Sequence, residues 1–486
     1  NIGEYLEIEG PLVLPLFERA LRQVVSESET LRAVFFEQAG EPRQSIRPPS
    51  AWSLPIIDLS NETDARAAAE SWMHADLERP LDLASGPLFG FALFKVSPQR
   101  HYWYARYHHI VLDGYGMWLV ARRVAEVYSH LCAGQQSPNP FGSLSDMLDL
   151  DGAYRASPRI SEDRQYWSDA LSGLPEQGVL TLSKRPSTKP DRFMRVTSVL
   201  PRGVSDALRS VSERSGSSLA RVLCAATAVF LHRHTGASDV VIGLPVSSRD
   251  STSRAVPAMT SNVLPLRLSV HPAMTVAETV DQAALNIRLG LQHQQLQLAD
   301  IRRVNGAEAD ASALFGVSIN VMSFDYSFDF AGLRVLARNL SLGPVEDLSI
   351  SVYDRSDGTP LRIDLDVNSA LHTAADLVAY QERFLQLLAE MVEPARRVGN
   401  LQLLSREERT NILQRWNDTA RALPLVNVPT LFAEQARRTP DAVAIISGDR
   451  RLTYAELDAH ANQLAHHLRG QGIGPESIVG LMVERS

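Results

Sequence analysis

Cysteine is scarce in this sequence, with only Cys132 and Cys224 among 486 residues. Two cysteines are too few for a disulfide framework or for a cysteine-rich zinc site. Both lie in apolar, helix-like surroundings, so we expect them to be buried free thiols. Because the first residues also lack a basic segment followed by an apolar one, the sequence shows no secretion signal, and we expect a cytoplasmic location.

Long apolar runs and dense basic segments are missing too. No stretch approaches the ~20 uninterrupted apolar residues that a membrane-spanning helix requires. The net charge is −8, which argues against nucleic acid and anionic membrane surfaces as partners. With 44% hydrophobic and 21% charged residues, the composition is that of a globular protein. The length suggests roughly three folding units of about 150 residues each.

Hydrophobic periodicity predicts strands and helices in both halves of the chain. In the first half, a strand at residues 5–9 precedes a helix at 15–25, and a hairpin of strands at 88–96 and 101–107 leads into a helix after residue 116. The second half has helices at 218–235 and 375–393 and strands at 239–246, 263–268, 315–321 and 361–367. This alternation favours an α/β fold with two lobes.

Irregular stretches indicate where the lobes and domains end. Residues 133–158 look irregular, and a loose stretch at 184–191 marks a boundary between an N-terminal lobe, residues 1–175, and a C-terminal lobe, residues 176–404. A linker is expected at 405–429.

Residues 430–486 form a third part, with helices expected at 431–437 and 457–469 and a strand at 442–446. We interpret this part as a truncated domain, because the apolar strand expected at 478–483 has nothing after it to cover its faces. The chain also opens directly in a strand, so we expect its beginning to be cut away.

The connection at residues 108–114 (HHIVLDG), between the hairpin and the following helix, carries the chemistry. A histidine titrates near neutral pH, so it can hold an amine or move its proton. The carboxylate of Asp113 can fix the connection through a buried ion pair, and Gly114 lets the backbone turn into the helix. Such a connection suits a transfer reaction whose substrates need alignment and the movement of one proton.

The same residues match the His-His-x-x-x-Asp-Gly signature, and the sequence resembles the condensation domains of nonribosomal peptide synthetases. Three further segments resemble family elements in the family's order: ETLRAVF at 29–35, GLPVSSR at 243–249 and NVLPLR at 262–267. This resemblance covers about residues 1–400. After it, LTYAEL at 452–457 resembles the first core motif of adenylation domains.

The resemblance implies two chloramphenicol-acetyltransferase-like lobes that form a V-shaped pseudo-dimer with a central tunnel. It further implies an acyltransferase without a metal or a covalently bound cofactor. The phosphopantetheine arms of an acceptor carrier protein and of a donor carrier protein, or acyl-CoA in place of the donor, would enter the tunnel. The adenylation domain adjoins in the same chain.

By position in the motif, His109 is the catalytic residue, which either positions or deprotonates the amine. The supporting residues are His108, Asp113 and Gly114, with Asp113 paired to Arg249. The candidate tunnel residues are Met117, Ser318, Asn320 and Ser349. A second histidine pair, His466 and His467, has no Asp-Gly at the right spacing, and we expect it to lie on a helix surface.

Within this resemblance, three functions stay open. Tyr115 and Gly116 stand where many elongation domains have Trp-Ser, which, with residues 121–128, favours a starter-type domain that acylates the first amino acid with a fatty or short acyl group. The alternatives are elongation-type peptide-bond formation and a non-catalytic docking platform for carrier proteins. An epimerisation domain is disfavoured by the adenylation-like segment that follows.

Overall fold

The computed structural model describes residues 1–174, 193–214, 216–306, 314–323, 326, 328–355, 359–423 and 425–483. The chain divides into two compact units, Asn1–Arg406 and Glu407–Ser486. The lobe boundary expected at 175/176 and the loose stretch at 184–191 lie outside the described residues.

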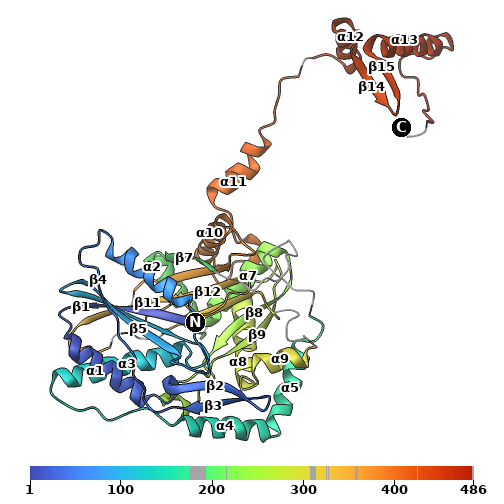
Figure 1. Ribbon diagram of the computed structural model, residues 1–486. Coiled ribbons are helices and arrows are strands. Elements are labelled where there is room, and N and C mark those ends of the chain that lie inside the picture. The colour runs from blue at the N-terminus through green and yellow to red at the C-terminus, as the bar shows by residue number, and fades with distance from the viewer. Residues whose placement is uncertain are drawn as a thin grey trace. The chain divides into compact units, whose positions relative to one another are not determined.

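A five-stranded sheet organises the first half of unit 1, in the order β11-β1-β6-β5-β4 (Figure 1). Its strands are β1 (Ile2–Glu9), β4 (Ile56–Asp58), β5 (Phe89–Ser97), β6 (Arg100–Tyr107) and β11 (Arg334–Ser341). Side chains alternate along β1, so Ile2, Leu6 and Ile8 join one core and Tyr5 joins another. Helices α1 (Leu14–Glu27) and α3 (Gly114–Cys132) supply the first core, and α2 (Ala65–Leu77) supplies the second.

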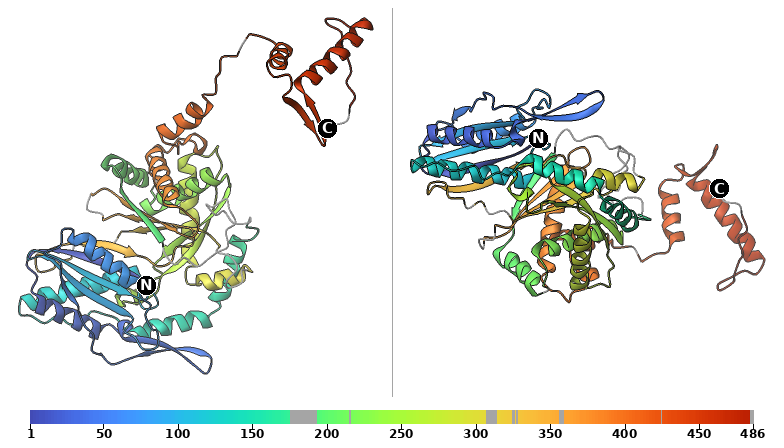
Figure 2. Two further views of the ribbon diagram at one scale, coloured as in Figure 1. Left: turned by 45° about the horizontal axis from the view of Figure 1, so that its top comes forward. Right: turned by 90° about the horizontal axis from the view of Figure 1, so that it is seen from below.

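One strand of this sheet comes from the second half of the chain. β11 pairs antiparallel with β1, with Leu6 opposite Ala337. Figure 2 shows the blue-to-cyan elements of the first half of unit 1 gathered together and the green-to-orange elements beside them. β11 falls in the orange range by residue number but pairs within the first sheet, so the chain crosses the division expected from sequence position.

A six-stranded sheet organises the second half, in the order β7-β13-β12-β10-β8-β9. Its strands are β7 (Phe193–Val199), β8 (Asp239–Val246), β9 (Asn262–Ser269), β10 (Val317–Met322), β12 (Leu348–Tyr353) and β13 (Arg362–Asn368). Helices α6 (Arg202–Arg214), α7 (Leu219–Thr235), α8 (Val276–Gln292) and α10 (Ala374–Glu390) pack into its core. The predicted α/β character of both halves is confirmed.

Smaller elements complete unit 1. They are the hairpin β2 (Ala33–Gln38) and β3 (Glu41–Ile46), and the helices α4 (Leu144–Ala156), α5 (Arg159–Ala170) and α9 (Leu298–Val304). The helix α4 corrects the expectation that residues 133–158 are irregular. Only Leu144 of this helix is buried, so its sequence has little apolar periodicity to reveal it.

Unit 2 contains the helices α11, which begins at the unit boundary (Arg406–Leu413), α12 (Val428–Arg438) and α13 (Tyr454–Gly470), with the hairpin β14 (Val443–Ser447) and β15 (Arg450–Thr453). The expected helices at 431–437 and 457–469 and the strand at 442–446 are confirmed. The strand expected at 478–483 is wrong: this segment has no regular structure, and Ile478 is 100% exposed. No neighbouring described strand pairs with it to satisfy its backbone.

The two cysteines differ in exposure. Cys224 is buried, but Cys132 is exposed at the end of α3, so the expectation of two buried thiols is wrong for Cys132.

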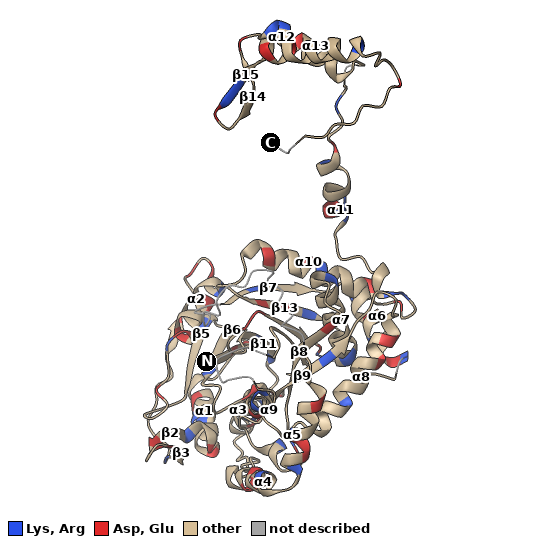
Figure 3. Cartoon of the chain, turned by 90° about the vertical axis from the view of Figure 1, so that its right-hand side faces the viewer, with Lys and Arg blue, Asp and Glu red and all other residues tan. Residues whose placement is uncertain are grey.

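Lys and Arg are interspersed with Asp and Glu along the helices of Figure 3. Among the described residues, no helix is long and apolar enough to cross a membrane. The cytoplasmic location expected from the sequence is not tested by this finding and stays a prediction.

Candidate active site

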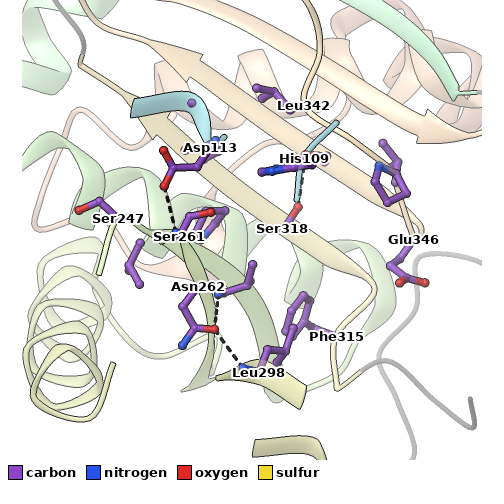
Figure 4. Close-up of a pocket in the computed structure, with 18 of the residues that line it drawn as sticks. His109, Asp113, Ser247, Ser261, Asn262, Leu298, Phe315, Ser318, Leu342 and Glu346 are labelled. Atoms are coloured by element: carbon purple, nitrogen blue, oxygen red, sulfur yellow. Dashed lines mark hydrogen bonds between the residues drawn. The ribbon is translucent and has the colours of Figure 1, made fainter. Parts of the chain in front are cut away.

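A cavity of about 470 Å³ opens where the residue 108–114 connection meets the six-stranded sheet. Its walls come from the start of α3, the ends of β8 and β9, the strands β10 and β12, and the segment at 342–346 (Figure 4). Elements of both halves of unit 1 therefore contribute to one cavity. A cavity of this size can hold small-molecule groups.

The imidazole of His109 lines this cavity. Its Nδ1 atom is buried and has no hydrogen-bond partner among the described residues. Gly343 lies against the ring: a Cβ atom added there would lie 3.5 Å from the His109 Cδ2 atom, and the φ of 107° favours glycine. Because the imidazole lines the cavity, it can hold an amine there or accept a proton from it.

His108 is half-buried and makes a local contact instead. Its Nδ1 atom accepts a hydrogen bond of 3.1 Å from the backbone N–H of Ile110. Burial lowers the pKa of His108, and the neighbouring His109 lowers it further. The ring is therefore neutral at pH 7, and its acceptor nitrogen is used to shape the turn that presents His109.

Asp113 is buried at the start of α3 and receives hydrogen bonds on both carboxylate oxygens. Oδ1 accepts from the backbone N–H of Gly116 at 2.7 Å, which caps the helix. Oδ2 accepts from the backbone N–H groups of Thr260 and Ser261, each at 3.0 Å. The dashed line between Asp113 and Ser261 in Figure 4 marks one of these bonds. The carboxylate thus joins α3 to the loop before β9.

Arg249 lies beside this carboxylate, with its Nη2 atom 2.9 Å from Asp113 Oδ1. The guanidinium also donates to the carbonyl oxygens of Ser253, Val256 and Ala258 at 2.6–2.7 Å. Its carbon lies 4.7 Å from the centre of the Tyr115 ring. The pair is almost fully buried, with 2% of the arginine side chain and 3% of the aspartate side chain exposed. It holds the whole 249–261 loop against α3.

Gly114 begins α3 and lines the cavity, while Gly116 is the third residue of the helix. A Cβ atom on Gly116 would lie 2.9 Å from Leu112 Cδ2 and 3.1 Å from the carbonyl oxygen of Ala258. Glycine at 116 therefore allows the close approach of α3 to the loop. In the sequence, Gly116 was informative because it favours a starter-type domain, and this close contact could not be predicted.

Three of the four candidate tunnel residues line the cavity: Ser318, Asn320 and Ser349. The alternation along β10 explains this, because Val317 and Ile319 enter the core while Ser318 and Asn320 face away from it. The Ser318 and Ser349 hydroxyls are 3.3 Å apart on neighbouring strands. Met117 lines a smaller pocket next to the cavity instead.

Sequence reasoning missed Thr260 and Ser261, since the hydrogen bonds to Asp113 span 147 and 148 residues and leave no local pattern. It also missed a buried histidine–carboxylate contact in unit 1, between His372 and Asp347. The pair at His466 and His467 is exposed on α13, as expected.

Comparison with protein-family models gives two matches. A condensation domain model matches residues 1–413, and an AMP-binding enzyme model matches residues 432–486.

Individual proteins agree with these matches. The chain is 42% identical, over its full length, to the dimodular nonribosomal peptide synthase of Bacillus subtilis and 37% identical to the isonitrile lipopeptide synthase of Streptomyces coeruleorubidus. It spans 20% of the first relative's length and 33% of the second's. It is also similar to a solved variant of the starter condensation domain of rhizomide synthetase in complex with C8-CoA. That similarity has a TM-score of 0.77 and 39% identity, and covers 83% of this chain and 92% of the other.

Proposed function

Because this chain belongs to the condensation domain family, we propose that it forms an amide bond between a donor acyl thioester and the amine of a carrier-bound aminoacyl acceptor. Members of this family are amide-bond-forming acyltransferases, and their two-lobed, chloramphenicol-acetyltransferase-like fold confirms the predicted fold class. The observation that carries the proposal is the His109 imidazole, which lines a cavity built from both halves of unit 1.

The reaction assigned to this cavity balances without any further reagent. The acceptor amine attacks the thioester carbonyl carbon, the tetrahedral intermediate collapses, and the carbon–sulfur bond breaks. The products are the amide and a thiol, and the proton lost by the amine reaches the sulfur. His109 orients the amine or carries this proton. Asp113 and Arg249 touch neither substrate in this scheme and keep α3 and the loop before β9 in place.

We further propose that the domain is of the starter type and uses acyl-CoA as its donor. Two observations support this subtype: Tyr115 and Gly116 after the motif, and the 39% identity to a starter condensation domain that binds C8-CoA. The remaining parts of the proposal are an acceptor carrier protein as partner and an adjoining adenylation domain that begins after a linker at 405–429. Residues 1–175 and 176–404 would be the two lobes.

Single-turnover acylation followed by intact-protein mass spectrometry tests this function. An aminoacyl-loaded acceptor carrier protein is mixed with the chain and with acyl-CoA or acyl-carrier donors. Transfer from acyl-CoA supports the starter type, whereas transfer from carrier-bound aminoacyl donors alone makes it an elongation domain. Carrier binding without transfer from any donor would leave only the docking platform. The exposed His466→Ala variant is the matched control for substitutions of histidine.

A further inference from the structure

A second pocket, of about 40 Å³, adjoins the active-site cavity. The two share Gly114, Met322 and Leu342 in their linings, so the small pocket is a side branch of the cavity that holds His109. Its other lining residues include Glu4, Tyr326 and Tyr353. Asn339 and Arg355 line it too, so five polar side chains lie among its apolar lining residues and offer partners to a polar ligand atom.

Glu4 is a charged residue on an otherwise apolar face of a strand. It occupies the face of β1 that carries Ile2, Leu6 and Ile8, all of which are core residues. Only 5% of Glu4 is exposed. Its Oε2 atom accepts a hydrogen bond of 2.8 Å from the Tyr326 hydroxyl, and burial raises its pKa to about 7. A carboxyl group in this position is costly for the fold, since among the described residues it has one side-chain partner, the Tyr326 hydroxyl.

Tyr353 supplies an independent observation. It lies on the cavity-facing side of β12, because Ile350 and Val352 enter the core of the six-stranded sheet. Its hydroxyl is buried and has no hydrogen-bond partner among the described residues. Buried hydroxyl groups are normally paired, so an unpaired one that lines a pocket indicates a position for a ligand atom.

The charges of the lining restrict the ligand. Arg355 lines the pocket, with its Nη2 atom donating to the Ala337 carbonyl oxygen at 3.1 Å, and its charge disfavours a cationic ligand. Glu4 disfavours an anionic one. An alkyl group would leave the Tyr353 hydroxyl and the carboxyl group without new partners. A neutral hydroxyl group fits, because it can donate to Glu4 and accept from Tyr353.

We propose that this side pocket binds a hydroxyl group of one of the two substrates, with Glu4 and Tyr353 as its hydrogen-bond partners. The inference rests on the proposed amide formation and deepens it, since it assigns a specificity-determining element to the same site. The hydroxyl group belongs either to the donor acyl group or to the acceptor side chain. The pocket's size restricts the bound part to a short group that ends in, or carries, this hydroxyl.

Matched substrate pairs separate the two sources. In the donor arm, short aliphatic and aromatic acyl thioesters, each with and without one hydroxyl group, compete for one loaded acceptor. In the acceptor arm, carriers loaded with serine or alanine, threonine or valine, and tyrosine or phenylalanine compete for one donor. We expect the hydroxylated member to be preferred at least tenfold in one arm, because a site built to bond a hydroxyl rejects the analogue that lacks it.

Substitutions link that preference to the pocket. Tyr353→Phe and Glu4→Met should bring the ratio of rates close to one, by slowing the hydroxylated substrate, while Glu4→Gln keeps an acceptor and should retain part of the preference. Tyr102→Phe is the control, since Tyr102 is a buried tyrosine that packs on the face of the five-stranded sheet opposite to Glu4. Circular dichroism checks that each variant is folded.

Binding to the His109→Ala variant, measured by calorimetry with N-acetylcysteamine thioesters, keeps this test separate from the proposed function. One outcome is that the wild-type chain transfers no acyl group while the hydroxylated ligand still binds at least tenfold more tightly than its partner. If Tyr353→Phe then removes this difference in affinity, the pocket assignment stands and the proposed function does not. If no pair differs more than twofold in rate or affinity, or if Tyr353→Phe leaves the ratio unchanged, the pocket assignment is overturned.

Discussion

Replacing Asp113 by asparagine places an amide N–H₂ group where every contact is already a donor. The carboxylate accepts from Gly116, Thr260 and Ser261 and pairs with Arg249. Whichever way the amide turns, its N–H₂ group faces donors, and the buried guanidinium loses its counter-charge. Breaking one partner of a buried ion pair costs about 3–5 kcal/mol.

This magnitude converts into a melting shift. An unfolding entropy of about 2.1 cal/mol/K per residue over the 406 residues of unit 1 gives about 0.85 kcal/mol/K. A loss of 3–5 kcal/mol therefore lowers the melting temperature of this unit by roughly 4–6 °C. Scanning calorimetry of the full chain measures this, since the unit that melts earlier in the variant identifies the site.

A double substitution tests the cause. If the loss comes from an unpaired charge, Arg249→Met combined with Asp113→Asn should cost less than the two single changes added together. Strict additivity, or a shift below about 1 °C for Asp113→Asn, would refute the reasoning, since it would mean that the pair does not hold α3 to the loop before β9.

Three other outcomes follow from the structure. Burial raises the pKa of Glu4 to about 7, so between about pH 4.5 and 7 the unfolded state ionises first and the stability falls as the pH rises. Glu4→Gln should remove roughly 3 kcal/mol of this fall in stability. Urea unfolding at pH 5 and at pH 8 measures it. Gly116→Ala should destabilise by about 1–3 kcal/mol because of the contacts with Leu112 and Ala258, whereas Gly152→Ala, where the added Cβ meets open space in α4, should not; thermal unfolding compares them. A thiol reagent should label Cys132 in the folded chain and Cys224 only after denaturation, as peptide mapping will show.

The sequence predicted the elements whose periodicity is local. The hairpin of β5 and β6, the helix α3 and the helix α7 all appear close to the expected residues, because each buries one face or, for α7, almost its whole surface. The motif also indicated a contact between Asp113 and Arg249, which no periodicity could reveal across 136 residues.

Long-range pairing was the main feature that the sequence could not predict. β11 pairs with β1 although more than 300 residues separate them, and nothing in its own residues names that partner. Glu4 left a readable signal that was not used: it interrupts an alternation of apolar residues on β1, and such interruptions can mark functional positions.

The central claim is that His109 carries amide formation in the cavity between the two halves of unit 1. The most direct measurement is the single-turnover rate of amide formation by the wild-type chain and by His109→Ala, with saturating donor and acceptor. The account predicts a loss of roughly 10²–10⁴-fold for His109→Ala with unchanged carrier binding and unchanged rate in His466→Ala. A rate in His109→Ala within threefold of the wild-type rate would contradict it.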